Sequence, residues 1–219
     1  LFDGYSKISE EDFDAIKFDN KYSLQSRSYK YISKIFTRDF ESDELNYAKE
    51  VLKKWDLATD FENTSAALGV CVLSSEWISE QGQRIPQDPE ISFRDCVDEL
   101  TETYGKVDPK WSERNFLVRG NKKVAVQGGP DVLRAIYGRN DDTGDLSAAG
   151  GDGLYIHVSW DKNRIQKSKS IHQYGSATQN SDSVHFDDQL DLYAAQKYKP
   201  TFFEESLLDE NISKVYYVP

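Results

Sequence analysis

The residues of this chain that could act as nucleophile and base are two cysteines and three histidines. A side-chain nucleophile needs a base within hydrogen-bond reach. Cys71 lies in the most apolar run of the sequence, where a reactive thiolate is disfavoured. His185 is followed by Asp187 and Asp188, so a carboxylate could orient its ring. In such a polar segment a structural hydrogen bond is the favoured interpretation.

The other two histidines, His157 and His172, fall on a predicted strand and at the end of its partner. We interpret both as sheet residues rather than bases. Cys71 and Cys96 fit neither a C-x-x-C motif nor a metal-binding spacing. A disulfide between them is one alternative, in an oxidising compartment. The preferred interpretation is two buried, inert thiols.

Two loops have compositions that could bind a ligand. Asp141 to Asp145 place acidic side chains around Gly144, as a calcium loop would, but the EF-hand pattern with its bidentate Glu is absent, and a solvated turn is favoured. The glycine-rich stretch 150–153 precedes a strand, whereas a phosphate cradle precedes a helix. Asn63 and Asn211 begin glycosylation sequons. The sequence therefore assigns no catalytic, cofactor-binding or metal-binding residue to this chain.

Composition limits the class of protein. The net charge is -11, which disfavours nucleic-acid binding, and the densest basic cluster is interpreted as the solvated face of a hairpin. This cluster consists of Lys162, Arg164, Lys167 and Lys169. No run reaches the roughly 18 apolar residues that membrane insertion requires. With 219 residues and many aromatic side chains, the chain can bury a core and offers large contact surfaces.

Residues 1–105 are predicted to be mainly helical. Ser9 to Asp12 nearly match a capping box, and the region 43–55 has Leu45, Ala48, Leu52 and Trp55 on one stripe. The region 64–81 is apolar all round, which is typical of a buried helix. A third helix is predicted over about 92–104, ending at Gly105.

Residues 106–219 are predicted to mix strands and loops. A short strand is expected at 122–126. Apolar residues alternate from Leu154 to Trp160, which indicates a strand buried on one face at least, and 165–171 returns as its partner. The sequence thus predicts a β-hairpin over 152–172, a short helix near 187–198 and an α+β fold.

Four blocks in this order resemble the acyl-homoserine-lactone acylase branch of the penicillin acylase family, and they span nearly the whole chain. They are Ile8–Phe13 with Ala15–Ser23, Val51–Asp60, Gly128–Ile136, and Ser170–Thr178 followed by His185–Gln189. The resemblance implies the C-terminal portion of a four-layer αββα N-terminal-nucleophile hydrolase. It also implies a precursor, or zymogen, that cuts itself to free a serine whose α-amino group acts as base.

The family's substrates would be N-acyl amides, either acyl-homoserine lactones, which implies quorum quenching, or the side chains of β-lactam antibiotics. The resemblance carries no catalytic residue onto this chain, which begins with Leu1 and not with Ser, Thr or Cys. We therefore expect a fragment that is inactive alone and forms one structural unit with an upstream part of the same precursor. A periplasmic or secreted location is implied, and any structural calcium of the parent enzyme would have its ligands elsewhere.

Two other hypotheses compete with the enzyme-part reading. One is a catalytically inactive binding or scaffold module derived from the same fold, which would be a stable monomer. The other is a self-contained enzyme that uses Cys71 or His185.

Overall fold

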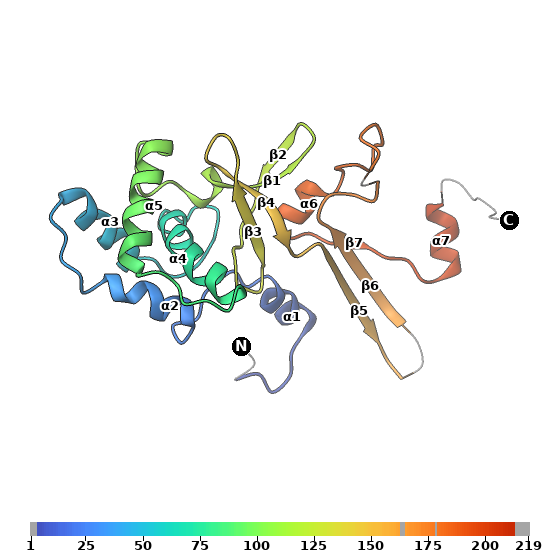
Figure 1. Cartoon of the computed structure of the whole chain (residues 1–219). Helices are drawn as coiled ribbons and strands as arrows, with labels where there is room; N and C mark the ends of the chain where they lie inside the picture. Colours follow the sequence, from blue (N-terminus) through green and yellow to red (C-terminus); the bar gives the residue numbers. More distant parts are fainter. Residues whose placement is uncertain (1–3, 163–164, 178, 213–219) are drawn as a thin grey trace. The chain divides into compact units, whose positions relative to one another are not determined.

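The computed structural model describes residues 4–162, 165–177 and 179–212 of the chain. These residues form two compact units, and the boundary between the units lies between Gly151 and Asp152 (Figure 1). The first unit contains five of the α-helices and a four-stranded sheet, and the second contains a three-stranded sheet with two short helices. The predicted α+β class is confirmed. The predicted change from helices to strands near residue 105 lies inside the first unit.

The first helix begins with the capping box that the sequence predicts. Helix α1 spans Glu10–Lys17. Ser9 Oγ accepts a hydrogen bond from the Asp12 backbone N–H, and the Asp12 carboxylate accepts one from the Ser9 N–H, both at 3.0 Å. Two N–H groups that the helix itself leaves unpaired are thereby satisfied.

The longer helices of the first unit agree with the sequence pattern. They are α3 (Asp43–Lys53), α4 (Ala66–Gln81) and α5 (Pro89–Tyr104). Helix α5 starts earlier than predicted, because a proline in the first turn sacrifices no hydrogen bond and Asp88 caps the Glu90 N–H. Gly105 ends α5 in the left-handed region, at φ +68°. The short helix α2 (Arg27–Ile32) and the 3₁₀ turn after it (Ser33–Ile35) were not predicted.

The sheet of the first unit has the strand order β2-β1-β4-β3. Strands β1 (Asn115–Arg119) and β2 (Lys122–Ala125) form a hairpin, β4 (Leu146–Gly151) runs parallel to β1, and β3 (Ile136–Asn140) is antiparallel to β4. Only β2 was predicted from the sequence. The other three strands are short and contain glycine, asparagine or arginine, so they lack a clear apolar alternation.

The core of the first unit lies around α4 and the residues before it. Gly69 on α4 allows the Trp55 ring to approach the helix backbone, because a Cβ there would lie 2.3 Å from Trp55 Cε3. Tyr22 packs edge-on against Trp55 with 5.6 Å between the ring centroids. The Trp55 indole N–H donates to the Ala58 carbonyl at 2.8 Å, so this large ring is buried with its polar group satisfied.

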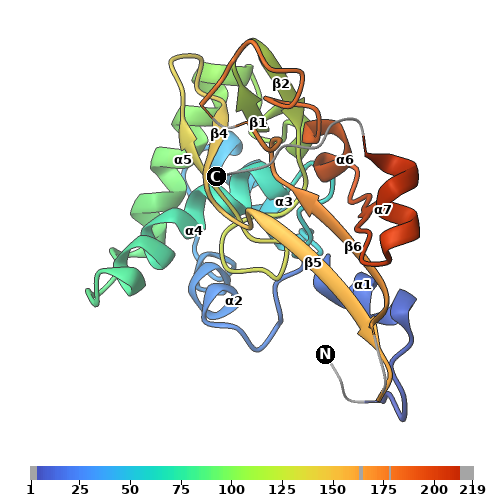
Figure 2. The same cartoon turned by 90° about the vertical axis from the view of Figure 1, so that its right-hand side faces the viewer.

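In the second unit the predicted hairpin is confirmed. Strand β5 (Leu154–Trp160) pairs antiparallel with β6 (Ile165–His172), and β6 pairs with the short β7 (Lys199–Pro200) (Figure 2). The short helix predicted near 187–198 is α6 (Leu190–Ala194). Helix α7 (Glu205–Asn211) was not predicted.

The two faces of this hairpin differ in burial. On one face Tyr155 and Ile171 are cross-strand partners and both are buried, and Tyr155 stacks on Tyr193 of α6 at 5.6 Å. On the other face Leu154, Ile156 and Trp160 are 53%, 59% and 71% exposed. Strand β5 is also an edge of the sheet, since among the described strands it pairs with β6 alone. Residues described in this unit therefore cover one face and leave the other open.

Candidate functional site

The two cysteines form a disulfide. Cys71 on α4 and Cys96 on α5 are bonded, with 5.9 Å between their Cα atoms. The preferred expectation of two free, buried thiols is wrong, because the apolar runs of both helices place the two side chains opposite each other across the α4–α5 interface. Cys71 has no thiol to act as nucleophile, so the hypothesis of a cysteine enzyme on Cys71 is wrong as well.

His185 has a carboxylate partner, as the sequence suggested, and its other contacts hold a loop together. Its Nδ1 lies 2.8 Å from Asp188 Oδ2, and its ring is largely exposed. The His185 carbonyl accepts a hydrogen bond from the Ala177 N–H at 3.0 Å. A Cβ on Gly175 would lie 2.2 Å from this carbonyl oxygen, so glycine is required for the close approach of the two loop segments. Asp187 accepts the Leu190 N–H at the entrance to α6 through its backbone carbonyl.

The other histidines belong to the sheet, as expected. His157 lies on β5 opposite Lys169, and His172 ends β6. The His172 N–H donates to the Gln189 side-chain oxygen at 3.0 Å, and the Gln189 N–H donates to the Tyr174 carbonyl at 2.8 Å. The block 170–178 and the block 185–189 are therefore joined by hydrogen bonds, which fix the loop between β6 and α6.

The acidic loop 141–145 closes on itself. The Asp141 carboxylate accepts hydrogen bonds from Thr143 and from the Asp145 N–H, and the hydrogen bond from the Thr143 side chain is the largest of the effects that lower the pKa of Asp141. Lys123 reaches Asp145 at 2.6 Å. An ammonium group and the loop's own donors thus occupy the oxygens that a cation would need, which agrees with the solvated turn that the sequence favoured.

The remaining candidates are also structural or peripheral. Stretch 150–153 joins the end of β4 to β5, so it precedes a strand as expected. Asn63 uses its side chain to cap α4, accepting from the Ala66 N–H at 2.9 Å. Asn211 ends the exposed helix α7. In the basic cluster Lys162 and Lys167 are exposed, Lys169 lies over the Tyr198 ring, and Arg164 is outside the described residues.

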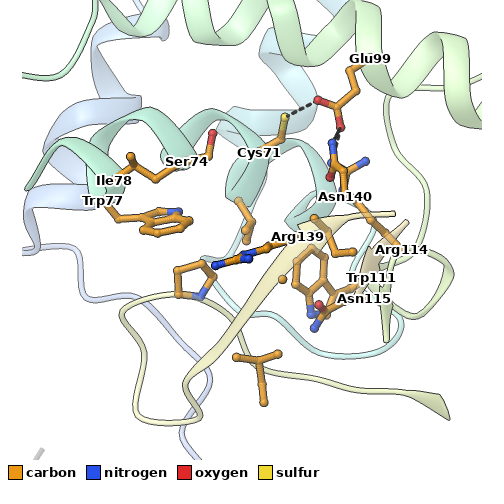
Figure 3. A pocket seen from close by; sticks show the side chains of 15 residues that line it. Cys71, Ser74, Trp77, Ile78, Glu99, Trp111, Arg114, Asn115, Arg139 and Asn140 are labelled. Atoms are coloured by element: carbon orange, nitrogen blue, oxygen red, sulfur yellow. Dashed lines mark hydrogen bonds and ion pairs between the residues drawn. The ribbon is translucent and has the colours of Figure 1, made fainter. Parts of the chain in front are cut away.

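The sequence did not reveal a pocket in the first unit, which lies between helices α4 and α5 and the sheet. Its volume is about 430 Å³, within the range of small-molecule sites. Figure 3 shows Trp77 and Ile78 of α4 on one side, Trp111 and Asn115 on the other, and Arg139 of β3 between them. The apolar surface includes both indole rings, and a few polar groups converge on it.

The polar groups of the pocket are centred on an ion pair. Arg114, which is 2% exposed, donates through Nη2 to Glu99 Oε1 at 2.5 Å. Asn140 donates to the same carboxylate oxygen at 3.2 Å. Cys71 Sγ lies 3.8 Å from Glu99 Oε2, and because a disulfide sulfur carries no proton this is a contact only.

Two residues that line the pocket, Trp111 and Asn115, donate hydrogen bonds to the same backbone carbonyl, that of Gly128. The Trp111 indole N–H donates to the Gly128 carbonyl at 3.0 Å, and the Asn115 side-chain amide donates to the Val126 carbonyl at 2.9 Å and more weakly to Gly128. Sequence reasoning missed these residues because a single buried Arg or Asn in a short strand leaves no periodic signal.

Among the described residues no group of three or more His, Cys, Asp or Glu side chains could hold a metal ion. Within the same residues no helix has the length and apolar character that crossing a membrane requires.

Three of the sequence blocks, within 8–23, 51–60 and 128–136, are joined by hydrogen bonds in the first unit. The Tyr22 N–H donates to the Leu57 carbonyl at 3.0 Å, and the Thr59 N–H donates to the Asn20 carbonyl at 3.1 Å. The Gly128 N–H donates to the Thr59 carbonyl at 3.1 Å, and the Tyr22 hydroxyl donates to the Pro130 carbonyl at 2.6 Å. Three blocks that are distant in sequence therefore form one hydrogen-bonded layer beside the core.

Comparison with known proteins agrees with this convergence. No curated protein matches the chain closely enough to count as a relative. The sequence model of one family, described as Penicillin amidase, matches residues 3–210 and thus covers all of the blocks and most of both compact units. The chain therefore belongs to the penicillin amidase family.

Proposed function

We propose that this chain is the C-terminal part of an amidase that hydrolyses N-acyl amide bonds, and that its nucleophile lies on another part of the same precursor. The substrates would be acyl-homoserine lactones or the side chains of β-lactam antibiotics. The nucleophile would be a serine at the N-terminus of the partner segment, activated by its own α-amino group. The chain alone would be inactive, and the complete fold would have four layers.

The observation that carries this proposal is the open face of the second unit. Leu154, Ile156 and Trp160 are more than half exposed on one face of β5, and no other strand of the described residues pairs with the outer edge of β5. Proteins seldom leave an apolar sheet face and a free edge uncovered, because both promote aggregation. A second layer contributed by a partner segment would cover the face and pair with the edge.

The two residues that were candidates for a self-contained site also favour this proposal. Cys71 is in a disulfide, and the His185 ring is paired with Asp188 on an exposed loop. Neither arrangement joins a nucleophile to a base. The disulfide also favours an oxidising compartment, so we propose a periplasmic or secreted location.

The test is to coexpress this chain with the polypeptide encoded upstream of it and to purify the chain by a tag. Intact mass and N-terminal sequencing should identify a tightly bound polypeptide that begins with Ser. The complex should release the amine from N-acyl-homoserine lactones or from a β-lactam with an acyl side chain, and the isolated chain should not.

A matched pair of substitutions tests whether the partner polypeptide binds to the open face of β5. Ile156→Lys should reduce both the recovery of the partner and the activity at least tenfold, because a buried unpaired charge is costly. Ile85→Lys is the control, since Ile85 lies in a loop and is 94% exposed. Normal assembly of the Ile156→Lys chain would contradict the proposed interface. A monodisperse, cooperatively melting chain with no partner would favour the alternative, a catalytically inactive binding or scaffold module.

A further inference from the structure

The pocket between α4, α5 and the sheet contains an unusual concentration of unsatisfied polar atoms. Trp77 Nε1, Arg114 Nε and Nη1, and Asn115 Oδ1 are buried and have no hydrogen-bond partner among the described residues. All three residues line the pocket. Buried polar atoms are nearly always hydrogen-bonded to protein, to ordered water or to a ligand, so this cluster marks one cavity whose lining has unused polar groups.

The charged residues that line the pocket indicate the charge of a ligand that would bind there. The charged residues that line it are Glu99, Arg114 and Arg139. Glu99 is already bonded to Arg114 and to Asn140. The Arg139 side chain has no hydrogen bond or ion pair with any residue in the described part of the chain, although it extends between the two indole-bearing sides of the pocket (Figure 3). The local balance is one uncompensated positive charge, which a singly charged anion would neutralise.

We propose that this pocket binds a small organic carboxylate with an apolar body. The carboxylate meets the Arg139 guanidinium, since arginine binds carboxylates through parallel N–H donors. The apolar body lies against the indole rings of Trp77 and Trp111. A site of about 430 Å³ suits a ligand with one or two rings or a short chain.

The wall opposite Trp77 fits the same occupant. Gly138 brings the β3 backbone close to the Asn115 amide, and a Cβ on Gly138 would lie 3.5 Å from Asn115 Oδ1 and 2.7 Å from Leu146 Cβ. The Asn115 Nδ2 group is fixed by the Val126 carbonyl, so its Oδ1 is oriented without a protein donor. This oxygen can accept from a hydroxyl or N–H group next to the carboxylate or from a water that accompanies it.

The site belongs to the first unit alone, so the inference does not depend on the proposed amidase function. The experiment uses 2-naphthoate as the probe and uncharged 2-naphthamide as the matched control, titrated into the full chain, together with its partner polypeptide if folding requires one. Calorimetry gives the affinities, and the indole N–H resonance of Trp77, assigned with a Trp77→Phe variant, reports contact. We expect 2-naphthoate to bind at least about tenfold more tightly than the amide, the effect of one charged hydrogen bond, and to shift the Trp77 resonance.

Three variants connect the binding with the pocket. Arg139→Gln should weaken 2-naphthoate at least about tenfold and leave 2-naphthamide unchanged, and it should fold normally because Arg139 is exposed. Ser74→Leu, from a half-buried lining position on α4, should weaken both probes by filling the cavity. Arg84→Gln removes an exposed arginine outside the pocket and should change neither affinity.

Equal affinity for the acid and the amide would overturn the proposal and leave a merely apolar hollow. Full affinity of the Arg139→Gln chain, or an unmoved Trp77 resonance, would also overturn it. If the probe binds the isolated chain but not its complex with a partner polypeptide, the pocket is an interface with that polypeptide and the ligand site is refuted.

Discussion

The two compact units differ in how much apolar surface each covers with its own residues. In the first unit one cluster of buried side chains extends from Tyr22 to Val132, and it includes most of the N-terminal half of α4. The second unit buries Tyr155, Ile171 and a few residues of α6, and it exposes the other face of β5. The same kind of apolar pattern is therefore used for a closed core in one unit and for an open face in the other.

This difference shows that an apolar pattern predicts an element and not the partner that buries it. Helix α4 and strand β5 both carry strongly apolar sequences. Leu68 on α4 is 0% exposed, whereas Leu154 on β5 is 53% exposed. Surface that is not removed from water does not contribute the hydrophobic free energy of about 25 cal/mol per Å², so the two regions should respond differently to the same substitution.

A matched leucine pair gives the largest expected contrast. Leu68→Ala should lower the free energy of unfolding by roughly 2 to 5 kcal/mol, because it removes a fully buried side chain and leaves a cavity. Leu154→Ala should change it by less than about 0.5 kcal/mol, as is typical of an exposed position. Urea denaturation of the isolated chain measures both. Similar losses for both variants would mean that β5 is covered in the isolated chain.

The disulfide is a second source of stability that only the first unit has. Replacing Cys71 and Cys96 together by Ala should lower the free energy of unfolding by about 3.5 kcal/mol in the chain-entropy description of disulfides, since the bond closes a loop with a sequence separation of 25. Denaturation of the double variant and of the unchanged chain with and without reductant measures the effect. A reductant that destabilises the double variant as much as the unchanged chain would show that the loss has another origin.

A pair of glycines tests packing in the two units. Gly69→Ala should cost roughly 1 to 3 kcal/mol, because the new methyl group would collide with the buried Trp55 ring. At Gly153 in the second unit a Cβ would meet no atom within 4 Å, so Gly153→Ala should be nearly neutral. Thermal unfolding of the two variants measures the contrast. A neutral Gly69→Ala would show that Trp55 can move, and that the first core is less rigid than its contacts indicate.

Local signals explain how much of the fold the sequence predicts. The capping box at Ser9, the apolar helix ending at Gly82 and the alternation from Leu154 to Trp160 each depend on neighbours in sequence, and all three elements are confirmed. Strands β1, β3 and β4 depend on pairing between distant segments, and they were missed. The four-layer arrangement depends on residues beyond those described and stays a prediction.

The pocket was beyond sequence reasoning for a similar reason. It is lined by residues from two helices and three strands, and none of them has a distinctive spacing. The Cys71–Cys96 bond was left open because spacing alone does not show that α4 and α5 pack side by side. Conversely, the blocks that indicated the family correspond to chain segments joined by backbone hydrogen bonds, such as Asn20 to Thr59.

The smallest expected effect on stability comes from a buried carboxylate in the first unit, that of Glu76. Glu76 on α4 pairs through Oε1 with Arg27 Nε at 2.7 Å, and its other oxygen has no hydrogen-bond partner among the described residues. Burial raises the pKa of Glu76 above its ordinary value of 4.5, and the nearby Arg27 opposes this effect only in part. The charged form of Glu76 is therefore less favourable in the folded first unit than in water.

The sign of the resulting pH dependence follows from linkage. Because the folded pKa of Glu76 exceeds the unfolded one, the folded state binds a proton more readily, and stability falls as pH rises from 4.5 through the folded pKa. Glu76→Gln removes this decline, so the stability of the variant relative to the unchanged chain should increase between pH 4.5 and 7. Glu80→Gln, which removes an exposed carboxylate near the same guanidinium, measures the loss of an Arg27 partner alone. Urea denaturation across this range measures the three chains, and a Glu76→Gln curve parallel to that of the unchanged chain would show that the charge is hydrated after all.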